Sequence, residues 1–466
     1  MAQQVKVMGA IYSDVPSLLL PDENDVMHHF DDTSVTTATA ADVAEGKVFI
    51  ASDGTITTGT ASSGGTITVV DTPDGHGGTI REITATNVTT LVEKTITENG
   101  TYDPSDDDAD GYSSVTVNVG GGITADQIAE RTISGVVEGS AATIGSYAFY
   151  NCSQITGASF PNAEIIGDQA FSSCASLSFV SFPNVTGINS SAFYNCHSLA
   201  EANFPSATYI YGYAFARCFA LSQVSLPEVK RIFGYAFMEC SNLQTVDLPE
   251  ASMIGASAFG SCSNLQTVNL PKASSIGINA FYNCSRLSFV SCPSFSGIIQ
   301  SGAFDGCYKL ETAYLPSATG VGSCAFRTCY SLYGIVLSSA SVIYSQAFQS
   351  CGLRSVDFPM VKTIYSSAFA YCSHISVASF PALTAITGSS VFYRCYRLVS
   401  LYLLGSSVAT LGVADAFSST PIGGYTDFTD GVLGNIYVPS SLYSSYRTAS
   451  RWSSFATRFV SVEGAE

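Results

Sequence analysis

The sequence predicts a solenoid of about 12–13 coils, with a 22-residue period and short parallel strands, preceded by small β-rich modules. The five-residue word AFYNC occurs three times, beginning at Ala148, Ala192 and Ala280. A Phe followed three residues later by a Cys recurs at a step of 22 residues, with late slips to 21 or 23. One unit reads roughly A-F-x-x-C-x-x-L-x-x-V-x-L-P-x-A-x-x-I-G-x-x. Self-similarity of this kind, sustained over twelve copies, is typical of a stacked-coil architecture.

Composition divides the chain into four expected parts. We expect a β-rich N-terminal attachment module over residues 1–65 and a small acidic β module with a Gly-rich hinge over residues 66–122. The solenoid with its N-terminal cap would occupy residues 123–420, and a C-terminal cap residues 421–466. The front parts contain alternating runs such as GTITVVDT bounded by Gly and Asp-Gly, which is typical of short strands joined by turns.

Charge is distributed unevenly along the chain. Residues 1–140 hold 22 acidic and 5 basic residues, whereas residues 141–466 hold 15 and 14. Neither part has the basic stripe that a phosphate backbone requires, so we expect no nucleic-acid binding. There is no run of eighteen apolar residues, so we expect no membrane insertion, and the N-terminus does not read as a secretory signal peptide.

The repeat pattern identifies the residues that face the core. Val and the following Leu alternate inward along a short strand that Pro ends, and the Ala, Phe and Cys of the returning segment also face inward. Stacked coils place identical residues above one another at roughly the strand spacing of 4.8 Å. The first rungs of this predicted core ladder are Phe149, Cys152, Phe171, Cys174, Phe193, Cys196, Phe215, Cys218, Phe237 and Cys240.

The fourteen cysteines do not form a metal-binding pattern. Twelve occupy one repeat position, which provides neither a C-x-x-C pair nor a compact set of four ligands, so we expect buried thiols that act as small hydrophobes. Cys292 replaces an inward Leu, and Cys324, off the ladder, is expected to be the most exposed thiol. His197 and His374 follow ladder cysteines, but other coils lack them, so we expect surface residues rather than Cys–His pairs.

The repeat unit resembles that of the BspA-like leucine-rich repeat family, whose units carry I-x-x-x-A-F-x-x-C-x-x-L-x-x-V-x-L-P. The resemblance covers roughly residues 141–420 and implies a leucine-rich repeat solenoid in a surface-exposed binding protein, without a catalytic motif. The closing segment IYVPSSLYSSYRTASRWSSFATRFVSV resembles the C-terminal end common on such arrays, where Trp452 is expected to seal the last coil.

Two front segments resemble modules of bacteriophage and prophage tail proteins. They are ADVAEGKVFIASDGTITTGT and KTITENGTYDPSDDDADGYSSVTVNV. The resemblance implies attachment to other virion tail proteins through the N-terminal segment. The short front β modules are too small to bury a good core alone, so we expect a homo-oligomer, and by analogy with tail fibres a trimer.

The second of these segments contains a weak calcium candidate. Asp106, Asp108 and Asp110 have EF-hand loop spacing, but Val117 stands where a bidentate Glu is required. We therefore expect a solvated acidic turn rather than a metal site, and we expect no cofactor.

Tyrosine is the most informative surface signal. Of 25 tyrosines, 22 follow residue 140, and the positions after the core Phe and after the Cys vary while the core hardly changes. Tyr offers flat contact area and a hydroxyl at small entropic cost, although such rings could simply pack across neighbouring coils. The candidate ligand-binding residues are Tyr150, Tyr194, Tyr282, Tyr308, Tyr330, Tyr393 and Tyr396. The alternative surface is the strand face marked by Ser225, Asp247 and Asn269.

Three functions follow from these features. The first is a phage tail fibre or receptor-binding protein, located in the virion, whose repeats bind a host cell-surface glycan or protein. The second is a bacterial surface adhesin, and the third a surface-polysaccharide depolymerase. The acidic front and the expected lack of an export signal favour the first. Because no G-x-S-x-G, Walker loop or H-E-x-x-H motif is present, we expect that the protein is not an enzyme.

Overall fold

The computed structural model describes residues 131–463 in full and, before them, only the course of ten short strands. These strands are β1 (Gln4–Val7), β2 (Ala10–Ser13), β3 (Ser17–Pro21), β4 (Met27–Asp31), β5 (Phe49–Ile50), β6 (Ile56–Thr57), β7 (Thr66–Pro73), β8 (Thr79–Thr86), β9 (Val92–Thr97) and β10 (Val115–Val117). Antiparallel pairing joins β1 to β2, β3 to β4 and β5 to β6, and joins β7–β10 into one four-stranded sheet. The acidic turn with Asp106, Asp108 and Asp110 lies outside the described residues.

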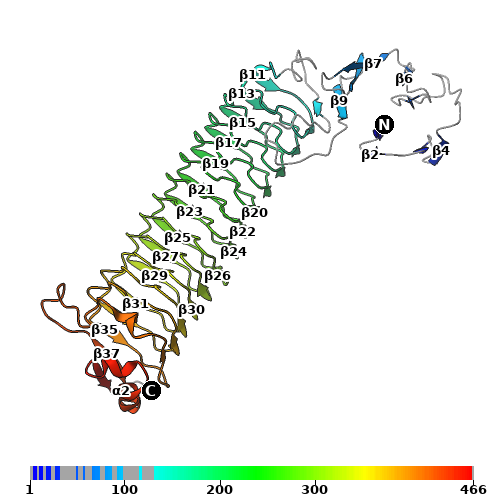
Figure 1. Ribbon diagram of the computed structural model, residues 1–466. Helices are drawn as coiled ribbons and strands as arrows, with labels where there is room; N and C mark the ends of the chain where they lie inside the picture. Colours follow the sequence, from blue (N-terminus) through cyan, green and yellow to red (C-terminus); the bar gives the residue numbers. More distant parts are fainter. Residues whose placement is uncertain are drawn as a thin grey trace.

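From Ser134 onward the chain winds into coils that stack into an elongated rod (Figure 1). Each coil contributes one strand to a first face and a two-residue strand to a second face. The first-face strands are β11 (Ser134–Glu138), β13 (Gln154–Ser159), β15 (Phe179–Ser181), β17 (Glu201–Asn203), β19 (Gln223–Ser225), β21 (Thr245–Asp247), β23 (Thr267–Asn269), β25 (Phe289–Ser291), β27 (Thr312–Tyr314), β29 (Gly334–Val336), β31 (Ser355–Asp357), β33 (Val377–Ser379), β35 (Ser400–Tyr402), β37 (Asn435–Pro439) and β38 (Phe459–Val462). The second-face strands are β12 (Thr143–Ile144), β14 (Ile165–Ile166), β16 (Gly187–Ile188), β18 (Tyr209–Ile210), β20 (Arg231–Ile232), β22 (Met253–Ile254), β24 (Ser275–Ile276), β26 (Ile298–Ile299), β28 (Gly320–Val321), β30 (Val342–Ile343), β32 (Thr363–Ile364), β34 (Ala385–Ile386) and β36 (Thr410–Leu411).

The register confirms the predicted parallel solenoid. Ala158 on β13 pairs with Val180 on β15, exactly one 22-residue repeat further on, and the same offset recurs along both faces. Within residues 131–463, thirteen coils carry both strands, and β37 and β38 extend the first face further. The predicted 12–13 coils agree with this arrangement.

The interior is a continuous ladder of phenylalanine rings. Phe149 and Phe171 stack at 4.9 Å between centroids, and the column runs one ring per coil to Phe417. These rings, and the Ala and Cys beside them, are buried, so the inward positions predicted from the repeat agree with the structure. Burial of so many large apolar side chains along one axis supplies the main stabilising term of the fold.

Each ladder cysteine also makes a hydrogen bond that the sequence reasoning did not anticipate. The thiol of Cys196 donates to the carbonyl oxygen of Phe171 in the preceding coil at 3.0 Å, and Cys262 does the same to Phe237 at 3.1 Å. All fourteen cysteines, which lie in the described part of the chain, are free; Cys324 is half-buried and the others are buried. Burial raises the pKa of the Cys292 thiol to about 12.

The turns between the second and first faces form a third side of the rod, which we call the turn side. It comprises the G-x-x-A-F-x-x-C segment of each coil. The residues two before and two after the core Phe have positive φ in coil after coil, as at Tyr213 (57°) and Arg217 (61°). This backbone is needed to turn the chain twice and bring Ala, Phe and Cys inward, although most of these residues are not glycine.

Two slips in the repeat interrupt the sheets. One extra residue between β25 and β26 breaks the second face into sheets of seven and six strands. One missing residue between Cys351 and β31 breaks the first face into sheets of ten and five strands. The Phe column continues through both slips, with Phe281 and Phe304 stacked at 5.4 Å and Phe348 and Phe369 at 5.4 Å.

The C-terminal cap closes the ladder. It contains η1 (Ala414–Phe417), η2 (Ser440–Leu442), α2 (Tyr443–Thr448) and η3 (Trp452–Phe455). The buried indole of Trp452 lies 5.9 Å from the ring of Phe417, and its Nε1 donates to the carbonyl oxygen of Ala409 at 2.7 Å. None of the helices in the described residues has the length and apolar character to cross a membrane.

Candidate ligand-binding site

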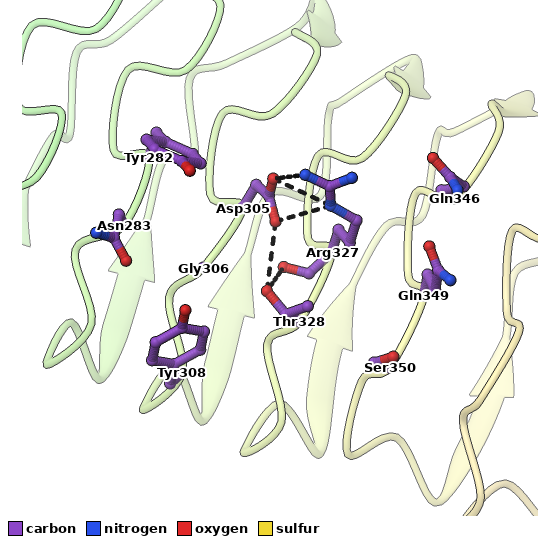
Figure 2. A pocket seen from close by; sticks show the side chains of 10 residues that line it. All are labelled: Tyr282, Asn283, Asp305, Gly306, Tyr308, Arg327, Thr328, Gln346, Gln349 and Ser350. Atoms are coloured by element: carbon purple, nitrogen blue, oxygen red, sulfur yellow. Dashed lines mark hydrogen bonds and ion pairs between the residues drawn. The ribbon is translucent and has the colours of Figure 1, made fainter.

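A hollow of about 470 Å³ lies on the turn side, between Tyr282 and Ser350 (Figure 2). Four successive coils supply the residue that follows the core Phe. The lining residues are Tyr282, Asn283, Asp305, Gly306, Tyr308, Arg327, Thr328, Gln346, Gln349 and Ser350. The volume is in the range of small-molecule sites, and most of the lining is polar.

The floor of the hollow is an ion pair between adjacent coils. Arg327 Nη2 lies 2.6 Å from Asp305 Oδ2, and Nε donates to both carboxylate oxygens at 3.1 and 3.2 Å. Thr328 Oγ1 adds a hydrogen bond to Asp305 Oδ1 at 3.3 Å. The Asp305 side chain is only 7% exposed, whereas that of Arg327 is 40% exposed. The fork geometry fixes the guanidinium plane of Arg327, which lines the hollow.

Gly306 lines the hollow where two coils approach each other closely. It occupies the position two residues after the core Phe, with φ of +76°, where the neighbouring coils carry Asn283 and Thr328. A Cβ atom at this position would lie 3.3 Å from the Cα atom of Asn283, so the backbone of the preceding coil leaves little room for a side chain.

Two aromatic rings stand at the edge of the hollow. Tyr282 and Tyr308 are each 43% exposed, and their side chains lie on the same side of the Asp305–Arg327 pair (Figure 2). Tyr308 stacks on Tyr330 of the next coil at 5.6 Å. The coil after that has Gly352 in the same repeat position, so the stack ends and Tyr330 is 60% exposed.

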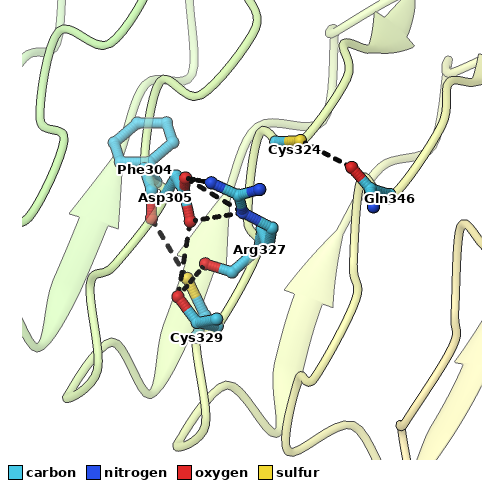
Figure 3. A network of polar contacts seen from close by, with 7 residues as sticks. Phe304, Asp305, Cys324, Arg327, Cys329 and Gln346 are labelled. Carbon is cyan, nitrogen blue, oxygen red and sulfur yellow. Dashed lines mark hydrogen bonds and ion pairs between the residues drawn. The ribbon is translucent and has the colours of Figure 1, made fainter.

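A second polar contact borders the ion pair (Figure 3). The thiol of Cys324 donates to Gln346 Oε1 at 3.3 Å, which orients the amide at the rim of the hollow. Burial raises the pKa of the Cys324 thiol, with a smaller opposing effect of Arg327. Cys324 is the half-buried cysteine, as expected, but its side chain is engaged rather than free.

The seven predicted tyrosines fall into two groups. Tyr282, Tyr308 and Tyr330 lie in or beside the hollow. The remaining four are half-buried and lie elsewhere: Tyr150, Tyr194, Tyr393 and Tyr396. Tyr393 meets Tyr371 of the preceding coil, as the alternative interpretation expected, whereas Tyr150 meets Tyr147 of its own coil and Tyr396 meets Phe428.

The strand face offers a flatter surface. Ser225, Asp247 and Asn269 are exposed there, and Asn269 Nδ2 donates to Asp247 Oδ1 at 3.2 Å. His197 and His374 are exposed, and His197 contacts Asn195 and Phe219 rather than the buried thiol of Cys196.

Sequence reasoning missed the polar floor. Asp305 and Arg327 are 22 residues apart, and each looks like one more variable residue after a core Phe. Stacking of consecutive coils brings these two opposite charges together. An acidic and a basic residue at the same position of consecutive repeat units was therefore the sequence feature that could have predicted the ion pair.

The arrangement suits binding more than catalysis. Asp305 is the one carboxylate among the lining residues, and Arg327 engages both of its oxygens, whereas glycoside hydrolysis ordinarily needs two carboxyl groups. In residues 131–463, His, Cys, Asp and Glu side chains nowhere gather in threes as a metal site requires. Amides, hydroxyls, a fixed guanidinium and exposed tyrosine rings are the groups that hydrogen-bond and stack on a hydroxylated ligand.

Solved structures with a similar fold come from several bacteria. A leucine-rich repeat protein from Bacteroides ovatus is 22% identical, with 67% of this chain and 92% of that one covered and a TM-score of 0.40. A leucine-rich cell surface protein from Faecalibacterium prausnitzii is 24% identical, with 70% of this chain and 82% of that one covered and a TM-score of 0.37. The T. pallidum leucine-rich repeat protein is 25% identical, with 46% of this chain and 87% of that one covered and a TM-score of 0.33. No curated protein matches the chain.

The family described as the BspA type leucine-rich repeat region matches in three overlapping stretches, residues 142–252, 208–333 and 297–423. Together these stretches cover more than half of the sequence. The chain belongs to the BspA-type leucine-rich repeat family.

Proposed function

We propose that the protein is a non-enzymatic recognition protein of a bacterial surface, of the adhesin type, whose solenoid binds a cell-surface glycan in the hollow around Asp305 and Arg327. The observation that carries the proposal is the combination of an oriented ion pair with exposed tyrosine rings in one open, polar depression. Membership of the BspA-type leucine-rich repeat family supports the surface location, because the family resemblance implies a surface-exposed binding protein.

The charge of the hollow favours a neutral glycan. Asp305 and Arg327 compensate each other, and the other lining side chains are uncharged. Contact would therefore depend on stacking and hydrogen bonds, with weak dependence on salt. A protein ligand is the competing class, and it would need a far larger area than the hollow to bind stably.

Treatment of the target cells separates these two classes. Purified full chain is added to intact bacterial and human epithelial cells before and after mild periodate oxidation, or after protease treatment. Loss of binding after periodate, with binding preserved after protease, supports a glycan. Loss after protease alone would indicate a protein ligand, and no binding to untreated cells would contradict surface recognition.

A tail-fibre role is the second candidate, and it also uses the solenoid for recognition. It is supported by the resemblance of the front residues to phage tail modules, which lie outside the described residues. In that case the front residues would join other virion tail proteins and assemble the chain as an oligomer. Detection of the protein in purified virions, or of tail and lysis genes beside its gene, would favour this role over the adhesin.

A further inference from the structure

A cluster of three exposed aromatic rings and one half-buried ring, that of Phe233, lies on two consecutive coils away from the hollow. Tyr213 and Tyr235 stack at 4.8 Å with planes 5° apart, and Tyr211 and Phe233 stack at 5.0 Å with planes 2° apart. Gly212 and Gly234 separate the two columns, so no side chain stands between them. We call these four rings the aromatic platform.

The platform ends abruptly at the following coil. Gly255 follows Phe233 in one column, and Ser257 follows Tyr235 in the other. The ring planes are stacked along the rod, so the outer faces of Phe233 and Tyr235 are turned toward these small residues. A planar ligand ring placed there would continue the stack, as sugar rings do against aromatic faces.

Two of these rings belong to residues whose backbone conformation is unfavourable for bulky side chains. Tyr213 and Tyr235 have φ of 57° and 63°, a left-handed conformation that favours Gly and Asn over bulky residues. The same repeat position is occupied by Ser257 and Asn279 in the next two coils, with φ of 50° and 56°. Smaller residues therefore satisfy the same turn, so the turn itself does not require the rings of Tyr213 and Tyr235.

Polar groups surround the rings. Arg217 lies over Tyr194, with its Cζ 6.0 Å from the ring centroid, and pairs with Glu239 at 3.2 Å. Burial and the neighbouring hydroxyls of Tyr235 and Tyr194 raise the pKa of Tyr213. The charges at this rim cancel, as they do in the hollow.

The size of the platform argues for a sugar rather than a protein. It is two coils wide, about 10 Å, whereas a stable protein interface needs roughly 800 Å² from each partner. Along the rod, two repeats separate the coil of Tyr235 from that of Tyr282, a distance of about 10 Å. Gln346 in the hollow occupies the same repeat position as Tyr235, so both sites are on the turn side.

We propose that the aromatic platform is a second carbohydrate-binding site and that, together with the hollow, it holds one neutral polysaccharide chain along the turn side of the solenoid. This inference rests on the proposed function for the glycan class of the ligand. Two sites about 10 Å apart on one rigid element fit successive sugars of an extended chain, and their joint use raises the affinity for a polymer over that for a short oligosaccharide.

Affinity electrophoresis of the full chain tests the proposal, with yeast mannan, dextran and arabinogalactan as separate probes in native gels. The platform variant is Tyr213→Asn with Tyr235→Asn, and the hollow variant is Tyr308→Ala with Gln349→Ala. The matched control is Tyr147→Asn, which changes a tyrosine of the same repeat position and φ (60°) outside the platform. We expect at least one polysaccharide to retard the wild type and the control equally, and both site variants to lose at least about fivefold in affinity.

Stability separates a binding role from a packing role. Because Asn tolerates the left-handed backbone, the platform variant should melt within about 2 °C of the wild type or above it. A second variant, Ser257→Arg, leaves all four rings in place and fills the space in front of Tyr235, and it should weaken retardation to a similar extent.

The outcomes distinguish the two claims. In one outcome the platform variant and Ser257→Arg are retarded as strongly as the wild type, and the hollow variant is not retarded. This outcome would overturn the platform as a binding site and leave the proposed function intact. In another outcome none of the three polysaccharides retards the wild type, and periodate treatment of cells does not reduce its binding to them. This outcome would overturn the proposed function itself. A trisaccharide unit of the retarding polysaccharide is the short competitor, and wild-type affinity for it equal to that for the polymer would overturn the bridging chain.

Discussion

The thiol of Cys240 donates a hydrogen bond to the carbonyl oxygen of Phe215 in the preceding coil, at 3.0 Å. Both groups are fully buried, and the same contact links coil after coil up to Cys395 and Phe369 at 3.1 Å. The carbonyl also accepts the backbone N–H of Cys218, so the cysteine position ties adjacent coils together as well as filling the core. A small apolar side chain with a weak donor meets both needs.

Native thiol labelling should be confined to Cys324. Burial raises the pKa of ladder thiols such as Cys218 and Cys262 well above the ordinary value of 9.0, and it also shields the sulfur from reagent. Mass spectrometry after brief alkylation of native protein should show modification at Cys324 alone, and at all fourteen cysteines after unfolding. Rapid native modification of several ladder cysteines would contradict the buried ladder.

Stability should fall steeply in alkaline solution. Unfolded thiols ionise near their ordinary pKa of 9.0, whereas burial raises the pKa of native thiols such as Cys307, so above that pH the native state binds more protons. The stabilisation that comes from these protonated buried thiols is therefore fully present below about pH 9. It is lost as pH rises toward the native pKa, and the free energy of unfolding falls by up to about 1.4 kcal/mol per pH unit for each thiol. Urea unfolding between about pH 7 and pH 11 measures this, and Cys240→Ser should make the loss shallower. A midpoint that is constant above pH 9 would exclude the effect.

Removal of Arg327 should destabilise the coils around the hollow. The change Arg327→Ala leaves the buried carboxylate of Asp305 with only the Thr328 hydroxyl. Because Arg327 is 40% exposed, solvent moderates the loss, and we expect about 2 kcal/mol in the free energy of unfolding.

The matched control for this change is Lys272→Ala. It removes the Lys272–Glu250 pair, whose side chains are 58% and 37% exposed, and should cost less than about 0.5 kcal/mol. Urea unfolding of both variants at one pH gives the comparison. Equal losses would mean that burial of Asp305 adds nothing to its pair.

Loss of the cap should be felt locally. Trp452→Ala removes a buried ring from the end of the Phe column and leaves the carbonyl oxygen of Ala409 without its indole donor. We expect the free energy of unfolding to fall by about 3–5 kcal/mol. Because each coil contacts only its neighbours, hydrogen exchange should become faster in β35–β38 than in β19–β21. Tyr443→Ala, which removes a half-buried ring of the same cap, is the milder control. Uniform acceleration along the whole rod would instead indicate a single cooperative unit.

The sequence predicts the ladder of Phe149 and Cys152 because a fixed period forces equivalent residues into one column. The turn-side tyrosines were predictable as variable positions, but not their grouping. Tyr150 and Tyr282 follow the same core Phe, yet one packs against Tyr147 and the other borders the hollow. Both residues occupy one repeat position, so the period alone does not predict which side chains surround each of them.

The aromatic platform illustrates the same limit. The strings YIYGY and RIFGY stand one repeat apart, so an aromatic pair in two columns could have been read from them. Tyr213 and Tyr235 were overlooked because they precede the core Phe, on the side of the turn where small residues are the rule. The front residues, with the predicted attachment and oligomer functions, lie outside the described residues, and those predictions stay untested.

The most direct test of recognition at the hollow is the dissociation constant of a bound glycan for the full chain and two double variants. Tyr282→Ala with Tyr308→Ala removes both rings of the hollow, whereas Tyr314→Ala with Tyr333→Ala removes two rings of 43% and 53% exposure outside it. Calorimetric titration should show at least about tenfold weaker binding for the first variant and unchanged binding for the second. Both should melt close to the wild type, since all four rings are exposed. Wild-type affinity in the variant without Tyr282 and Tyr308 would show that the ligand binds elsewhere.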